Sequence, residues 1–329
     1  MVARQRDENR DEIIHGYQPP IPLEAEVSLG RRMDIDPALL DETRPVRVYT
    51  HPHGDIWVGD AVAWLRRLPS ASVDLIFADP PYNLGKADWD SFASHQEYLR
   101  WSLRWIKQAA RVLKPTGTLY ICGFSEILAD VKLPASRYFL GARWLVWNYR
   151  NKGNMGSDWG RSHESILHFR KTKDFVFNGD DVRIPYGQHT LTYPDHPQAV
   201  TSHYGKGATR PDRWSPHPRG AKPRDVIEVP TTCNGMAEKT PHPTQKPEEL
   251  MRTFLLASTN PGDVVVDPFL GSGTTAAVAE QLGCHWKGCD LSLDYCGWAA
   301  DRIAAVMPRT RHEWIGYDRA NAQRRAAIR

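Results

Sequence analysis

Short apolar runs alternate with amphipathic segments along most of the chain. Residues 55–60 (DIWVGD) and 72–79 (SVDLIFAD) are apolar enough for strands buried on both faces, with a short helical pattern around AVAWLRRL between them. Apolar groups at helical spacing over residues 95–113 predict an amphipathic helix, which KPTG ends before a strand at TLYICG. This alternation is typical of the α/β class, with a mostly parallel sheet and helices on both faces.

The same alternation returns late in the chain. Helical patterns at KPEELMRTFLLAST, TTAAVAEQL and LDYCGWAADRIAAV are separated by strand patterns at DVVVDPF and HWKGCDL. We therefore expect one sheet built from two blocks, residues 51–182 and 241–308. Residues 1–50 lack sustained periodicity and are expected to form an N-terminal extension. Residues 309–329 are expected to form a basic tail, whose RRAAIR end suits a solvated helix or a phosphate contact.

Residues 183–240, between the two blocks, have a different composition. From Arg183 to Arg224 there are seven Lys or Arg against two Asp, and Tyr, Trp and His are interleaved with them. A solvated, loop-rich insertion explains this pattern, but basic and aromatic groups together also suit phosphate contact and base stacking. The candidate nucleic-acid-binding residues are Arg183, Lys206, Arg210, Arg213, Arg219, Lys222 and Arg224.

Composition excludes several classes of protein. No window approaches the roughly 18 apolar residues of a membrane span, and the first residues have no apolar signal segment, so a cytoplasmic protein is expected. Five cysteines at irregular spacing favour reduced thiols over a disulfide framework. The Cys and His residues between Cys284 and Cys296 fit no standard zinc pattern, so no metal is expected. The net charge of +3 is too small to indicate a nucleic-acid partner by itself.

A glycine-rich turn follows a buried strand in DVVVDPFLGSGTT, residues 263–275. Glycines allow the backbone to approach a ligand closely, and the helix that follows presents free N–H groups. The Gly-Lys-Ser/Thr ending of a nucleotide P-loop is absent. Asp290 lies 17 residues beyond Gly273, close to the spacing at which an acid binds a ribose. The pattern predicts an adenosine-bearing cofactor, with a purely structural turn as the alternative.

The tetrapeptide Asp79-Pro80-Pro81-Tyr82 places an acid, a rigid turn and an aromatic ring at the end of the strand SVDLIFAD. By itself it also suits a proline-ended strand. Together with HPTQKP (242–247), and with DPFLGSGTT followed by GCDLSLDYCGWAADRI, it resembles the S-adenosylmethionine-dependent DNA amino-methyltransferases. The order of the motifs resembles the β class, which has a circularly permuted Rossmann-like methyltransferase sheet and an inserted target-recognition region. The resemblance covers residues 55–307 and includes the segment 146–171 before the recognition region.

This resemblance implies a mechanism. The Asp79 carboxylate and the Pro80 carbonyl would accept hydrogen bonds from the exocyclic amino group of a flipped-out base. Pro81 would keep the turn rigid, and Tyr82 would stack on the base. An Asp in the first position, followed by Asn83, is usual among the adenine-N6 enzymes of the family, and cytosine N4 remains the alternative. Double-stranded DNA is the implied partner, while the dimeric state and an RNA substrate stay open.

The resemblance and the glycine turn also indicate how S-adenosylmethionine would bind. Asp290 would accept the ribose hydroxyls, Asp60 would lie near the adenine, and Lys246 near the cofactor or the phosphate path. His163 and His242 are expected to be structural, because methyl transfer to an amino group needs no strong general base. The candidate cofactor-binding residues are Asp60, Lys246, Asp267, Phe269, Gly271, Gly273, Thr274, Thr275 and Asp290.

Three other functions fit the sequence less well. C5-cytosine methylation uses a cysteine that normally follows proline, and none of the five cysteines does. A dinucleotide oxidoreductase would share the glycine turn but would leave DPPY and HPTQKP without a role. A non-catalytic nucleic-acid-binding protein is the alternative from a different class, and the intact motifs argue against it.

Overall fold

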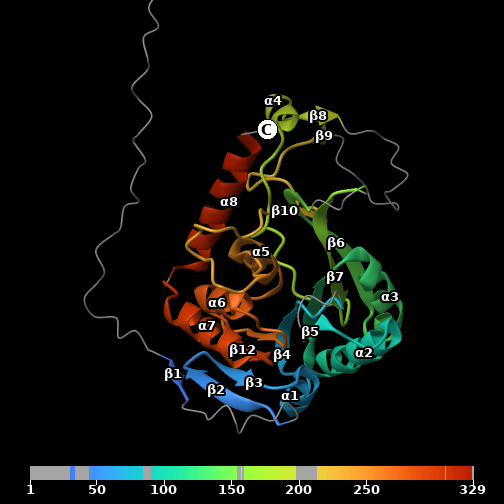
Figure 1. Cartoon of the computed structure of the whole chain (residues 1–329). Helices are drawn as coiled ribbons and strands as arrows, with labels where there is room; N and C mark the ends of the chain where they lie inside the picture. The colour runs from blue at the N-terminus through green and yellow to red at the C-terminus, as the bar shows by residue number, and fades with distance from the viewer. Residues whose placement is uncertain are drawn as a thin grey trace, which may run out of the picture.

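A ten-stranded sheet runs through the computed structural model, which describes residues 30–33, 44–83, 90–153, 157, 159–197, 213–307 and 309–327. Its strand order is β1-β2-β3-β12-β11-β4-β5-β7-β6-β10, and β8 and β9 form a separate pair (Figure 1). The strands are β1 Arg31–Arg32, β2 Val46–His51, β3 Gly54–Val58, β4 Val73–Ala78, β5 Leu113–Gly123, β6 Gly141–Gly153, β7 Arg161–Arg170, β8 His196–Pro197, β9 Arg213–Trp214, β10 Val226–Glu228, β11 Val264–Asp267 and β12 His285–Asp290. The helices are α1 Ala61–Arg67, α2 His95–Val112, α3 Ser125–Ala135, the 3₁₀ turn η3 Ser136–Tyr138, α4 Gln188–Thr192, α5 Glu248–Ser258, α6 Thr274–Gln281, α7 Leu293–Ala304 and α8 Arg311–Ala327.

The central strands run parallel, so their carboxyl ends meet at one edge of the sheet. β3, β12, β11, β4 and β5 pair in parallel, whereas β7 lies antiparallel between β5 and β6. β11 from the late block pairs with β4 from the early block, with Val265 opposite Leu75. The mostly parallel sheet is thereby confirmed, and the two blocks form one sheet.

Helices cover both faces of this sheet. In Figure 1, α5, α6 and α7 lie on one side, and α1, α2 and α3 lie on the other. Along β4, Leu75 and Phe77 belong to the core under α5–α7, and Ile76 and Ala78 to the core under α1–α3. Successive side chains of a strand point to opposite faces, so a strand covered on both sides is apolar throughout its length. All six residues of β4 are buried, as the apolar run predicts.

Two predicted boundaries are wrong. β5 begins at Leu113, so KPTG lies inside the strand rather than before it. The extension predicted over residues 1–50 ends earlier, because β2 (Val46–His51) pairs with β3 along its length. β2 was missed because its apolar residues, Val46, Val48 and Tyr49, are too few to give a periodic signal.

The residues predicted as a basic tail form helix α8, which packs beside α5 (Figure 1). Trp314 is buried, and the Arg252 guanidinium lies 4.3 Å from its ring centroid. Arg252 also donates to Asp318, at 3.0 Å. Arg325, within the RRAAIR end, pairs with Glu249 of α5. The C-terminal helix is thus part of the folded domain.

The segment between the two blocks also joins the sheet in part. β10, within residues 183–240, pairs in parallel with β6. The rest of the described segment, with α4, β8 and β9, lies at one end of the molecule (Figure 1). Lys206 and Arg210 fall among residues 198–212, outside the described residues. The five cysteines are free thiols, which confirms the prediction, and within the described ranges no helix is long and apolar enough to cross a membrane.

Candidate active site

Four acids lie at the carboxyl ends of neighbouring parallel strands. Asp60 follows β3, Asp79 follows β4, and Asp267 and Asp290 end β11 and β12. All four line one cavity of about 300 Å³. Of the other predicted site residues, those that also line this cavity are Pro81, Lys246, Phe269, Gly271, Thr274 and Thr275. Pro80, Tyr82 and Gly273 are outside its lining. The carboxyl edge of a parallel sheet is the usual place for a ligand site.

The glycine turn is held by the acid of the next strand. Asp290 accepts hydrogen bonds from the Gly271 N–H at 2.8 Å and the Ser292 N–H at 2.9 Å. Gly271 and Gly273 have φ of +52° and +78°, a conformation that favours glycine. A Cβ at Gly273 would lie 2.6 Å from the Ala299 Cβ, so this glycine is needed for packing against α7. A ligand is not what requires glycine there.

Asp267 is buried beneath the same turn. It accepts hydrogen bonds from the Phe269 N–H at 2.9 Å and the Thr275 hydroxyl at 2.6 Å. Burial raises the pKa of Asp267 to about 7, although these two hydrogen bonds oppose the shift. Asp267 and Thr275 therefore set the shape of the cavity wall.

The cavity lining fits an adenosine-bearing cation. Trp101 lies 5.1 Å from Phe92 and 5.6 Å from Phe269, ring centroid to centroid, which gives an apolar wall suited to a flat base. Asp290 keeps lone pairs for ribose hydroxyls beside the two N–H groups it already binds. The acids at the edge also complement the positive charge of a sulfonium. The residues present thus suit S-adenosylmethionine.

The catalytic candidate Asp79 is already engaged on both carboxylate oxygens. Oδ1 accepts the Tyr82 hydroxyl at 2.6 Å, and Oδ2 accepts Lys246 Nζ at 2.5 Å. Glu164, on β7, lies 3.1 Å from the same Tyr82 oxygen and 3.5 Å from the same Lys246 nitrogen. Burial alone lowers the pKa of Lys246, but the charges of Asp79 and Glu164 outweigh it and raise that pKa. Lys246 is therefore a buried ammonium between two acids.

The turn after β4 is held by a further acid that was not predicted. Asp90 is buried and accepts the backbone N–H groups of Tyr82 at 2.6 Å and Asn83 at 2.7 Å. The Tyr82 ring lies 5.1 Å from the Phe124 ring centroid. Stacking of Tyr82 on a base stays a prediction, and in this structure its hydroxyl faces the two acids.

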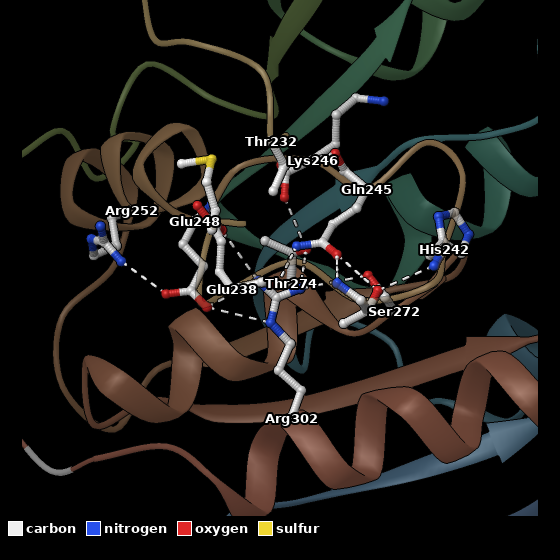
Figure 2. A network of polar contacts seen from close by, with 12 residues as sticks. Thr232, Glu238, His242, Gln245, Lys246, Glu248, Arg252, Ser272, Thr274 and Arg302 are labelled. Carbon is white, nitrogen blue, oxygen red and sulfur yellow. Dashed lines mark hydrogen bonds and ion pairs between the residues drawn. The ribbon is translucent and has the colours of Figure 1, made fainter. Parts of the chain in front are cut away.

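HPTQKP lies beside the glycine turn, and a polar network joins the two segments (Figure 2). The Thr274 hydroxyl donates to the Lys246 carbonyl at 3.1 Å and accepts from Arg302 at 2.8 Å. Arg302 also pairs with Glu248 at 2.9 Å and Glu238 at 3.3 Å. The Lys246 side chain points away from this network (Figure 2). The backbone that carries Lys246 is therefore fixed from below.

The histidines occupy the places expected of structural residues. His242 lines the cavity, and its ring lies 4.4 Å from the ring of Tyr295. Burial lowers the pKa of His242 to about 4, with the charge of Asp79 opposing that shift, so the ring is neutral near pH 7. The His163 carbonyl accepts the Tyr149 hydroxyl at 3.3 Å.

Sequence reasoning missed Glu164, Asp90 and Arg302. Glu164 had a weak signal, since an acid directly precedes the apolar run of residues 165–167 in a predicted family segment. Arg302 had none, because a helix-borne arginine is ordinarily solvent-exposed. Its side chain is only 8% exposed here.

The expectation of no metal stays a prediction. Within the described residues, two groups place three side chains near enough to share an ion: His51, His53 and Glu280; and Asp79, Cys122 and Glu164. In the second group, the Lys246 ammonium already lies against both carboxylates.

The described basic residues between the blocks are partly engaged within the protein. Arg183 and Arg219 both pair with Asp180, and Arg213 lies 3.4 Å from Asp195. A second cavity, of about 820 Å³, is lined by Arg183, Lys222 and Arg224 together with Arg143 and Arg170. Contact of these residues with DNA stays a prediction.

Comparison with known proteins agrees with this site. A family model described as DNA methylase matches residues 73–301. The chain is 36% identical over 243 residues to the type II methyltransferase M1.MboII of Moraxella bovis, covering 72% of this chain and 91% of that protein. It is 35% identical over 249 residues to the DNA adenine methyltransferase YhdJ of Escherichia coli K12, covering 74% of this chain and 81% of that protein.

Solved structures share the fold. The cytosine-N4-specific PvuII DNA methyltransferase superposes with a TM-score of 0.57 at 18% identity, covering 83% of this chain and 93% of the other. TTHA0409 of Thermus thermophilus, a DNA modification methylase solved with S-adenosylmethionine, gives a TM-score of 0.51 at 22% identity, covering 76% and 93%. The match of one family model to most of the chain, together with relatives above 30% identity, places this chain among the S-adenosylmethionine-dependent DNA methyltransferases of the N6-adenine/N4-cytosine family.

Proposed function

We propose that the protein methylates the exocyclic N6 of adenine in double-stranded DNA, with the target base flipped out of the helix. S-adenosylmethionine supplies an electrophilic methyl group when it is bound. The amino nitrogen of adenine is a poor nucleophile because its lone pair is delocalised into the ring. The task of the protein is therefore to position this nitrogen and to favour the form whose lone pair is free.

The observation that carries the proposal is the position of Asp79. Its strand, β4, pairs with β11, which leads into the glycine turn, and Asp79 lines the same cavity as Asp290 and Phe269. A carboxylate at this place accepts an amino N–H beside the cofactor. The Pro80 carbonyl would accept the second N–H, since Pro80 and Pro81 restrict the turn.

Target extrusion is required because the amino nitrogen cannot be attacked inside the duplex. The Tyr82 ring would stack on the extruded base after its hydroxyl leaves Asp79. Residues 183–240 would contact the DNA, with Lys222 and Arg224 closest to the described basic cavity. A cytoplasmic location and action as a monomer or homodimer belong to the same proposal.

Adenine is favoured over cytosine by the first residue of the tetrapeptide. Asp79 accepts an amino hydrogen bond more strongly than a hydroxyl in the same place. The relatives include an adenine enzyme and the solved neighbours a cytosine-N4 enzyme, so cytosine N4 is the second candidate.

The test is to incubate the protein with S-adenosylmethionine and unmethylated genomic DNA, digest the DNA, and identify the modified nucleoside by mass spectrometry. N6-methyladenine supports the proposal. N4-methylcytosine as the sole product would change the target base and leave the role of Asp79 intact. Single-molecule sequencing of the same DNA would give the recognition sequence.

A further inference from the structure

The catalytic carboxylate cannot bind a target base in the arrangement seen here. Both oxygens of Asp79 are engaged, one by Tyr82 and the other by Lys246. The Lys246 side chain is only 8% exposed, so an ammonium that leaves Asp79 does not reach water. A buried ammonium without a partner is strongly unfavourable. Binding of the base therefore requires a second acceptor for Lys246 within the protein.

Glu164 is placed to be that acceptor. Its Oε2 lies 3.5 Å from Lys246 Nζ, whereas the Asp79 oxygen lies 2.5 Å from it. A shift of the ammonium by about one ångström reverses the preference, which is within the reach of a lysine side-chain rotation. The same Glu164 oxygen lies 3.1 Å from the Tyr82 hydroxyl, so both donors that occupy Asp79 have a path to Glu164.

The surroundings keep Glu164 ready for this exchange. It lies on β7, next to β5, and accepts the Cys122 thiol at 3.3 Å. The Lys246 backbone is anchored through Thr274 and Arg302, so the ammonium moves without the loop (Figure 2). One ammonium serves two carboxylates, and whichever acid it leaves keeps a full negative charge to accept new donors.

We propose that Glu164 is a positioning residue that takes over the Lys246 ammonium and the Tyr82 hydroxyl when the target amino group binds Asp79. The exchange moves no proton between residues and breaks no covalent bond. It rests on the proposed function, since it assigns the event that frees Asp79 for the base. It also explains why a lysine is buried at a catalytic acid that must accept hydrogen bonds from the substrate.

A double-mutant cycle with Glu164→Gln and Lys246→Met tests the exchange. Glu164→Gln should slow single-turnover methyl transfer roughly 10- to 100-fold, because the ammonium then has no charged partner except Asp79. Calorimetry should show affinity for S-adenosylmethionine within about twofold of the parent. In the Lys246→Met background the same change should no longer slow transfer, since no ammonium needs a second acid. A purely structural role for Glu164 predicts equal slowing in both backgrounds, and that result would overturn the exchange.

Two further variants complete the experiment. Glu164→Asp keeps the charge and should be faster than Glu164→Gln; an aspartate as slow as the glutamine contradicts the proposal and covers the case in which the glutamine variant folds poorly. Glu126→Gln is the matched control, because Glu126 pairs with Arg161 at 3.0 Å on the surface and should leave transfer unchanged. If the parent protein methylates no DNA, the proposed function fails. If the parent is active and Glu164→Gln is equally active, the exchange alone fails.

Discussion

Replacement of Arg302 by Met should weaken both the fold and cofactor binding. Arg302 is nearly buried and donates to Glu238, Glu248 and Thr274. After its loss, Glu248 keeps Arg252 at 3.2 Å and the Gln281 amide at 2.8 Å, but Glu238 keeps chiefly the Glu248 N–H at 2.8 Å. Removing one partner of a buried charge network typically costs about 3–5 kcal/mol, a large fraction of the stability of a domain.

Urea denaturation of the unliganded protein measures this loss. Arg213→Met is the matched control, because Arg213 pairs with Asp195 while both side chains are more than half exposed, and such a pair is worth at most about 1 kcal/mol. Calorimetry should also show weaker binding of S-adenosylmethionine to the Arg302 variant, since Thr274 begins the helix after the glycine turn. Equal denaturation midpoints for the two variants would refute the reasoning.

The loss should depend on pH with a definite sign. Burial raises the pKa of Glu248, but Arg302 and the neighbouring hydrogen bonds outweigh it and lower that pKa below the usual 4.5. Such a carboxylate stabilises the fold above the pKa of the unfolded chain, and the contribution disappears as pH falls. The difference between parent and Arg302→Met should therefore be largest near neutral pH and shrink below about pH 4.5. A difference that grows in acid would contradict this assignment.

Three other outcomes are expected. Asp79→Ala should abolish methyl transfer and change cofactor affinity only a few-fold, whereas Asp290→Ala should weaken calorimetric cofactor binding by about 1–3 kcal/mol; parallel losses in both would merge the two roles. Asp267→Asn should flatten the stability curve between about pH 4 and 7 by up to ~4 kcal/mol, because a raised pKa stabilises the fold below that of the unfolded acid and the gain is lost as pH rises towards 7; an unchanged slope in urea titrations argues that Asp267 ionises normally. Lys222→Gln with Arg224→Gln should weaken DNA binding and reduce its salt slope by up to about one unit per lost phosphate contact, and identical slopes would make the segment a solvated loop.

The parallel core could be predicted because its signal is local. A strand covered on both faces must be apolar at every position, as β4 is, and a turn that leads into a helix carries its glycines in sequence. Asp79, Asp267 and Asp290 were found for the same reason, since each directly ends an apolar run. The convergence of these acids on one cavity follows from parallel pairing of β4, β11 and β12.

The parts that were missed depend on contacts between distant residues. Glu164 meets Lys246 and Tyr82 only because β7 lies beside β5, and nothing in the sequence gives that pairing. Arg302 is buried because the charges it binds are at Glu238 and Glu248, more than 50 residues earlier. Edge strands such as β2 are short and half-covered, so their apolar pattern is too weak to identify.

The charge of the cavity gives a physical reason to reject the oxidoreductase alternative. Its described lining carries Asp60, Asp79, Asp267 and Asp290, and the Lys246 ammonium there is already paired with Asp79. A dinucleotide brings a pyrophosphate whose two negative charges would face these acids with only the N-terminus of α6 to offset them. S-adenosylmethionine brings a sulfonium and an ammonium instead, so the same acids attract it. The acids that end β4, β11 and β12 thus select the cofactor by charge, beyond the single ribose contact that the sequence suggests.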